Sequence, residues 1–237
     1  MAKDVIIALD FNTAEETLKF LEGFKDLHPY VKIGMELYYA EGPSMVRELK
    51  RRGYHVFLDL KLHDIPNTVR KSMKVLAGMG VDICNLHAAG TTAMMRAALD
   101  GLTEGSNGGQ RPLLIAVTQL TSTSEEVMRK ELLIDHPIGE TVRHYAMNAR
   151  EAGLDGVVCS PLEAGIVKEA CGSHFLTVTP GVRFADSAAD DQSRVTTPAR
   201  ARELGSDYIV VGRPITQAPA PVAAYLRCKK EFLGTEN

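Results

Sequence analysis

The chain has 237 residues, of which 24% are charged and 45% apolar, and its formal net charge at pH 7 is −3. This composition is typical of a globular protein with a sizeable core and excludes a disordered chain. The sequence has no basic block long enough to follow a nucleic-acid backbone and no apolar run near the ~18 residues of a membrane span. We therefore expect this protein to bind neither nucleic acid nor a membrane.

Short apolar segments rich in Val and Ile alternate along the chain with longer amphipathic segments. The apolar segments predict eight strands, and their nearly continuous apolar character is typical of parallel strands that are covered on both faces. In chain order the predicted strands are Asp4–Asp10, Tyr30–Gly34, His55–Lys61, Asp82–His87, Pro112–Thr118, Gly156–Ser160, Phe175–Thr179 and Tyr208–Gly212.

The amphipathic segments between these strands predict helices. Several begin with a side-chain acceptor or an early proline, as at Thr13, Ser160 and Thr197, which suits the unpaired amides of a helix start. The predicted helices are Thr13–Leu27, Gly42–Arg52, Pro66–Met79, Thr91–Leu102, Ile138–Ala152, Pro161–Ala170, Pro198–Leu204 and Ala218–Phe232. Eight strand-helix units in a chain of this length predict a closed (β/α)8 (TIM) barrel as a single domain over residues 1–237, rather than an open doubly wound sheet.

The cysteines and the amino terminus indicate the compartment. Cys84, Cys159, Cys171 and Cys228 are scattered without C-x-x-C spacing, so we interpret them as reduced structural thiols. The chain enters its first strand directly, without a charged leader and a long apolar targeting segment. We therefore expect a cytoplasmic protein.

Three ionisable residues stand within six positions at the end of the third strand. Residues i and i+2 of a strand point to the same face, so Asp59 and Lys61 should project side by side, with Asp64 following where the strand ends. A buried ion costs several kcal/mol unless it is paired. The cluster is either a structural ion pair at a solvated strand end or part of an active site.

Active sites of such barrels form at the carboxyl ends of the strands, and polar residues gather there in this sequence. These are Asp10, Lys32, Asp59, Lys61, Asn85, His87, Gln119 to Ser122, Pro180 to Arg183, and Gly212 to Pro214. After the eighth strand, the Gly212 amide, the Arg213 guanidinium and a helix start together predict a phosphate cradle, and hence a phosphate ester as substrate. The long polar connection Val182–Val195 offers Arg183 and Gln192 as donors and is interpreted as a lid.

The motifs of common cofactor sites do not occur in this sequence. His63 and His87 lack the spacing of H-E-x-x-H or a neighbouring carboxylate cluster, so we interpret them as packed or rim histidines and predict no metal. No G-x-G-x-x-G follows a predicted strand, which argues against a nicotinamide or flavin site.

The segment from Asp59 to Thr68 reads D-L-K-L-H-D-I-P-N-T and resembles the D-x-K-x-x-D-I-P-x-T signature of the orotidine 5'-monophosphate decarboxylase family. The resemblance covers essentially the whole chain and agrees with the compact bacterial form. It is supported by Ala8 to Asp10, Lys32 to Gly34, Leu120 to Ser122, Pro180 to Arg183, and Val211 to Pro214.

The resemblance implies loss of carbon dioxide from orotidine monophosphate to give uridine monophosphate, the last step of de novo pyrimidine synthesis. It also implies a (β/α)8 barrel, no metal or organic cofactor, and a homodimer with shared active sites. Lys61 would protonate C6 of the pyrimidine, Asp59 would face the substrate carboxylate, and Lys32 would pair with Asp59 and reach the ribose.

The resemblance assigns further residues to the substrate and to the partner subunit. Asp10 would hold a ribose hydroxyl, and Asp64 and Thr68 would arrive from the partner. Thr121 and Ser122 would meet the base, and the phosphate would be bound by Arg183, Gln192, Gly212 and Arg213.

Two alternatives remain open from the sequence. Magnesium-dependent sugar-phosphate decarboxylases and aldolases of the same suprafamily share the D-x-K-x-x-D array, but they usually show a small pair such as Ala-Gly where this chain has Ile65 and Pro66. A non-catalytic barrel that binds a nucleotide would keep the charges as an ion-pair network. It would bind nucleotide without turnover.

Overall fold

The structure is a computed structural model that describes residues 3–186 and 196–234. Eight parallel strands form a closed barrel in chain order, and β8 pairs with β1 to complete it. The strands are β1 (Asp4–Ala8), β2 (Tyr30–Gly34), β3 (Val56–Leu62), β4 (Ile83–His87), β5 (Leu113–Val117), β6 (Gly156–Val158), β7 (Leu176–Thr179) and β8 (Tyr208–Val211). The predicted (β/α)8 barrel is confirmed.

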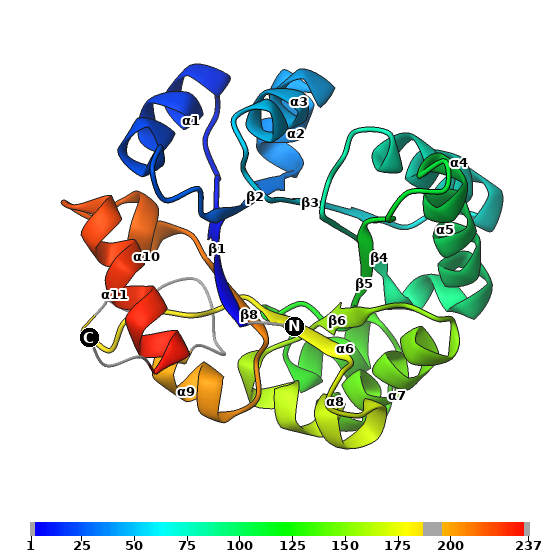
Figure 1. Cartoon of the computed structure of the whole chain (residues 1–237). Helices are drawn as coiled ribbons and strands as arrows, with labels where there is room; N and C mark the ends of the chain where they lie inside the picture. The colour runs from blue at the N-terminus through cyan, green and yellow to red at the C-terminus, as the bar shows by residue number, and fades with distance from the viewer. Residues whose placement is uncertain (1–2, 187–195, 235–237) are drawn as a thin grey trace.

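Helices surround this barrel as an outer ring (Figure 1). They are α1 (Ala14–Leu21), α2 (Met35–Glu41), α3 (Pro43–Arg51), α4 (Pro66–Ala77), α5 (Thr91–Gly105), α6 (Glu125–Glu131), α7 (Ile138–Glu151), α8 (Ala164–Cys171), α9 (Pro198–Glu203), α10 (Arg213–Thr216) and α11 (Pro221–Leu233). Short 3-10 turns are η1 (Glu22–Phe24), η2 (Ala88–Gly90) and η3 (Pro161–Glu163).

The strands are largely apolar because both of their faces are buried along most of their length. Ile6 of β1 packs with Phe57 and Ile115 in a cluster that fills the barrel interior. Its neighbours Val5 and Ile7 belong to the larger cluster between the strands and the helices. The side-chain period of two thus gives the strands a buried inner face and a buried outer face along most of their length.

The predicted strands are all present, with ends that differ from the predicted ones by at most two residues. Three short helices were not predicted, namely α2, α6 and α10, which have seven, seven and four residues. The predicted helix Thr13–Leu27 is divided into α1 and the 3-10 turn η1. All three unpredicted helices follow the carboxyl end of a strand, so they belong to the connections that surround the barrel mouth.

The predicted helix starts at Thr13, Ser160 and Thr197 are confirmed. Each side chain accepts a hydrogen bond from a backbone N–H in the first turn, of Glu16, Leu162 and Arg200 respectively. These bonds satisfy amides that have no partner within the helix.

The four cysteines are buried, and none of them forms a disulfide bond within the described part of the chain. Burial raises the pKa of the Cys84 thiol to about 12, so this group is neutral and unreactive. Among the described residues, no helix combines the length and the apolar character that crossing a bilayer requires.

Candidate active site

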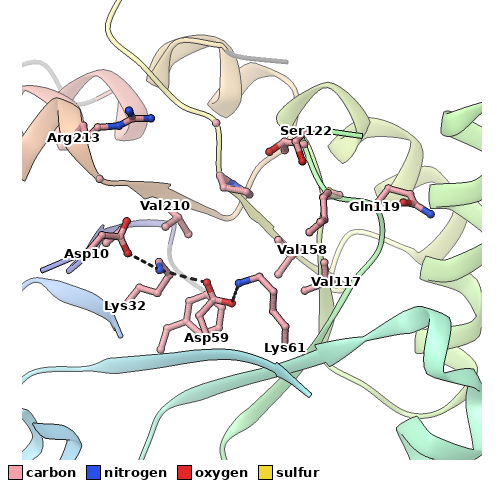
Figure 2. Close-up of a pocket in the computed structure, with 18 of the residues that line it drawn as sticks. Asp10, Lys32, Asp59, Lys61, Val117, Gln119, Ser122, Val158, Val210 and Arg213 are labelled. Atoms are coloured by element: carbon pink, nitrogen blue, oxygen red, sulfur yellow. Dashed lines mark hydrogen bonds and ion pairs between the residues drawn. The ribbon is translucent and has the colours of Figure 1, made fainter. Parts of the chain in front are cut away.

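The carboxyl ends of the strands surround a pocket of about 440 Å³ at one end of the barrel. Its lining brings together residues that are far apart in the sequence, from the ends of β1, β2, β3, β5, β7 and β8 (Figure 2). The predicted site residues that line it are Asp10, Lys32, Asp59, Lys61, Thr121, Ser122, Arg183, Gly212 and Arg213.

Four of these side chains form a charged row across the pocket floor (Figure 2). Lys32 Nζ lies 3.1 Å from Asp10 Oδ1 and 3.4 Å from Asp59 Oδ2. Lys61 Nζ lies 2.7 Å from Asp59 Oδ1. Opposite charges therefore alternate along the row, and Asp59 is held between two ammonium groups.

The centre of the charged row is nearly closed to solvent. Lys32 and Asp59 are each 9% exposed, whereas the side chain of Lys61 is 27% exposed toward the pocket. Burial raises the pKa of the Asp59 carboxyl, but the charges of Lys32 and Lys61 and the hydrogen bonds from Lys61 and Asn85 outweigh burial, and the pKa lies below its ordinary value. Asp59 is therefore a carboxylate at neutral pH.

Gly34, at the end of β2, leaves space for the Lys32 ammonium. Lys32 and Gly34 follow the same side-chain period, and a Cβ atom on Gly34 would lie only 2.9 Å from Lys32 Nζ. A larger residue at position 34 would displace the ammonium from Asp10 and Asp59. The glycine thus allows the close approach that the charged row requires.

Polar groups for the rest of a ligand lie above the charged row. Arg213 begins α10 directly after Gly212, and Figure 2 shows it across the pocket from Ser122, which follows β5 with Thr121. Arg183 lines the pocket from the connection after β7. A cationic group at one side, small hydroxyl groups at the other and ion pairs below suit an elongated, anionic ligand.

Two of the predicted residues that the structure describes, Asp64 and Thr68, do not line the pocket of their own chain. Asp64 and Thr68 are exposed, and the Asp64 carboxylate accepts a hydrogen bond from the N–H of Ile65. Gln192 lies outside the described residues. The lid predicted over Val182–Val195 also lies largely outside them.

Asn85 and Gln119 are visible in the sequence only as polar residues at strand ends. Gln119 is 8% exposed and lines the pocket. Asn85 is 1% exposed and lies behind the charged row, where it bonds to both Asp59 and Lys61. The available signal was an amide side chain between apolar residues of a strand, since a buried amide needs partners.

The two histidines near the site lie at its edge. The rings of His63 and His87 are 5.7 Å apart, and burial lowers the pKa of His87, as do the nearby His63 and Lys61. Within the described part of the chain, no group of three or more His, Cys, Asp or Glu residues is arranged to hold a metal.

Comparisons with known proteins give one consistent result. The family described as "Orotidine 5'-phosphate decarboxylase / HUMPS family" matches residues 3–228. Orotidine 5'-phosphate decarboxylase of Bacillus caldolyticus is 58% identical over 233 residues, which cover 98% of this chain and 96% of the relative.

Solved structures agree with this result. Orotidine 5'-phosphate decarboxylase from Lactobacillus acidophilus has a TM-score of 0.87 and 46% identity, with 97% of this chain and 99% of the other covered. An uncharacterized conserved protein from Geobacillus kaustophilus has the same TM-score and 52% identity. The match covers 96% of this chain and 99% of the other chain.

Proposed function

This chain belongs to the orotidine 5'-phosphate decarboxylase / HUMPS family and decarboxylates orotidine 5'-monophosphate in pyrimidine biosynthesis, and we propose that Lys61 donates the proton in this reaction. The observation that carries the proposal is the contact of Lys61 Nζ with Asp59 Oδ1 at 2.7 Å, on the floor of a pocket with arginines at its mouth.

The reaction passes through a high-energy carbanion intermediate. Loss of carbon dioxide from C6 leaves an electron pair in the plane of the pyrimidine ring, where no adjacent carbonyl is aligned to delocalise it. An ammonium group at C6 stabilises this charge and then donates a proton to it. Lys61 is suited to both tasks because its ammonium carries both a positive charge and a proton, and the contact with Asp59 at 2.7 Å holds it at the pocket floor.

Asp59 has a second proposed role. Its carboxylate is kept ionised at the pocket floor, where the substrate carboxylate would approach it. The repulsion between the two groups disappears when neutral carbon dioxide leaves, so it raises the energy of the bound substrate more than that of the transition state. Binding energy from the remote phosphate offsets this repulsion.

The remaining pocket residues are proposed to bind the parts of the nucleotide that do not react. Arg213, the Gly212 amide and Arg183 would bind the phosphate, together with Gln192. Asp10 and Lys32 would bind the ribose. Thr121 and Ser122 would bind the base.

We propose a homodimer whose subunits share their active sites. Asp64 and Thr68 belong to the same motif as Lys61, but both are exposed and neither lines the pocket of its own chain. Ile65, between them, is 66% exposed although it is a large apolar residue. An interface over this segment would bury Ile65 and deliver Asp64 and Thr68 to the partner's pocket.

The proposal requires neither a metal nor an organic cofactor, since Lys61 supplies both the positive charge and the proton. We also propose that the enzyme is cytoplasmic. The magnesium-dependent sugar-phosphate alternative makes the opposite prediction, that turnover stops when a chelator is added.

An ultraviolet assay of orotidine monophosphate decarboxylation with chelator present tests the proposal. Lys61→Ala should lower kcat by at least about 10³-fold, because it removes both the acid and the electrostatic stabilisation. The control is Lys25→Ala, which removes an exposed lysine at the end of η1 and should leave kcat unchanged. Near-normal turnover by a folded Lys61→Ala enzyme would exclude Lys61 as the proton donor.

A further inference from the structure

Asn85 lies on β4 directly behind the charged row. It is 1% exposed, and its side chain reaches β3 at two points. Asn85 Nδ2 donates to Asp59 Oδ1 at 2.7 Å, and Asn85 Oδ1 accepts from the backbone N–H of Lys61 at 2.8 Å. Asn85 does not line the pocket, so its contacts are with the proposed catalytic groups and not with the substrate.

The backbone at Lys61 departs from regular strand geometry. Lys61 has a φ of 52°, which is disfavoured for a residue with a Cβ atom. The pairing of β3 with β4 shifts here, since Leu58 pairs with Cys84 but Leu62 pairs with Leu86. Four steps along β3 therefore match two steps along β4, and the Asn85 side chain accepts the Lys61 N–H within this irregular stretch.

The three residues close a ring of hydrogen bonds. Lys61 is bound to Asn85 through its backbone N–H and to Asp59 Oδ1 through its Nζ atom, and Asn85 donates to that same oxygen. A carboxamide is required at position 85 because it offers a donor and an acceptor on one short side chain, whereas a carboxylate offers only acceptors. The ring fixes the Asp59 carboxylate and both ends of the Lys61 residue.

We propose that Asn85 is a positioning residue for the decarboxylation, and that it holds Lys61 in its left-handed backbone conformation so that the ammonium stays on Asp59 and is aimed at C6. This inference rests on the proposed role of Lys61 as the proton donor. A lysine side chain has four rotatable bonds, so its Nζ atom is well placed only if its backbone and its terminal partner are both held.

Asn85→Ala and Asn85→Asp test the proposal in the full-length enzyme. Asn85→Ala removes both bonds, while Asn85→Asp keeps the volume and the acceptor but loses the donor to Asp59. Each should lower kcat by about 10²-fold, since misplacement of a reacting group by about 1 Å has an effect of that size. KM should change by less than about 3-fold, because the phosphate-binding residues are untouched.

Thr177→Val is the matched control. Thr177 is a fully buried polar residue near the amino-terminal end of β7, where its hydroxyl bonds to the backbone of Gly205 and to Asp207, away from the pocket. This substitution should lower thermal stability but leave kcat unchanged. A loss of kcat that is confined to the Asn85 variants therefore separates positioning from general destabilisation.

The proposal is overturned if either Asn85 variant, when folded, keeps kcat within about 3-fold of the wild type, or if KM rises while kcat is unchanged. If Asn85→Ala does not fold, Asn85→Asp decides, because it preserves the packing. Lys61→Ala is assayed alongside. Activity in Lys61→Ala would refute the proposed proton donor, whereas an inactive Lys61→Ala beside fully active Asn85 variants would refute the positioning role alone.

Discussion

Lys61, the proposed proton donor, has a strained backbone conformation with a positive φ. Among the described residues other than glycine, five have a positive φ, and Lys61 is the one of these that lies in a strand. The left-handed region costs a residue with a Cβ atom roughly 1–2 kcal/mol. Strain of this kind persists only where the surroundings hold it. Here Lys61 is held by the hydrogen bonds that it donates to Asn85 through its backbone N–H and to Asp59 through its Nζ atom.

This strain predicts an unusual order of stability for two inactive variants. Lys61→Gly and Lys61→Ala both remove the ammonium, but only glycine also relieves the positive φ. After allowance for the greater flexibility of glycine in the unfolded chain, Lys61→Gly should be more stable than Lys61→Ala by about 0.5–1 kcal/mol. Urea unfolding at one fixed protein concentration measures the difference.

Position 32 provides the control for this comparison. Lys32 is also a buried member of the charged row, but its φ is not positive. Lys32→Gly should therefore be less stable than Lys32→Ala, by about 0.5–1 kcal/mol, as in an ordinary strand. The same order at both positions would contradict the strain at Lys61.

The sequence was sufficient to predict which charges meet but not how the backbone brings them together. The two-residue period of a strand predicts that Asp59 and Lys61 share a face, and their side chains do meet. The irregular pairing near Lys61 depends on the register between β3 and β4. No local pattern in either strand encodes that register, which is also why the partners of Asn85 could not be predicted.

Three aspartates link the amino-terminal ends of neighbouring strands. Asp82, Asp155 and Asp207 each directly precede an even-numbered strand, and each accepts a backbone N–H at the start of the preceding odd-numbered strand, at 2.7–2.8 Å. Their basic partners are Lys50, Arg111 and Lys168 respectively. Each aspartate follows a Gly-x pair in the sequence. These contacts stabilise the end of the barrel opposite the pocket.

The contact at Asp82 predicts how stability depends on pH. Burial raises the pKa of Asp82, but hydrogen bonds from Lys50, the Val56 N–H and His55 outweigh burial, so the pKa lies below its ordinary value of 3.8. A carboxyl group with a depressed folded-state pKa stabilises the protein above its unfolded pKa and loses this contribution as the pH falls through the folded pKa. Wild-type stability should therefore decrease below about pH 4.

Asp82→Asn should lower the free energy of unfolding at pH 7 by about 1–3 kcal/mol. It should also make the fall of this free energy between pH 7 and pH 3 smaller than in the wild type. The activity at pH 7 should persist, because Asp82 lies at the opposite end of the barrel from the pocket. Urea unfolding between pH 3 and pH 7 measures both effects. A pH curve for Asp82→Asn that runs parallel to that of the wild type would refute the contribution of Asp82.

The strands could be predicted from the sequence, whereas three short helices could not. A strand buried on both faces leaves an apolar run that is visible in the sequence. α2, α6 and α10 contain seven residues or fewer, which is too short for a helical period to be recognised. Helices of that length are not stable alone and form because the rest of the barrel holds them.

The barrel brings residues that are spread over most of the chain together around one pocket. The charged row comes from the first three strand ends, and the proposed phosphate-binding groups come from the last two. Asp64 and Thr68 are the exception, since they follow β3 but are exposed and do not line the pocket of their own chain. The proposed dimer accounts for them, because a two-fold axis would deliver each pair to the other subunit.

Mixing two inactive variants tests this arrangement. Lys61→Ala and Asp64→Ala homodimers each carry a defect in both sites. In a hybrid dimer, one site would carry both defects, and the other would combine Lys61 from one chain with Asp64 from the other. Random exchange should restore about a quarter of the wild-type specific activity, because half of the dimers are hybrids and each has one intact site.

Lys61→Ala mixed with Asp59→Ala is the matched control for this experiment. Lys61 and Asp59 contact each other within one chain at 2.7 Å, so each site of that hybrid keeps one defect and no recovery is expected. Subunit exchange is verified with differently tagged chains. If exchange is complete and the Lys61→Ala and Asp64→Ala mixture stays inactive, Asp64 does not act across the interface. In that case the exposed segment from Asp64 to Thr68 must reach the substrate within its own chain.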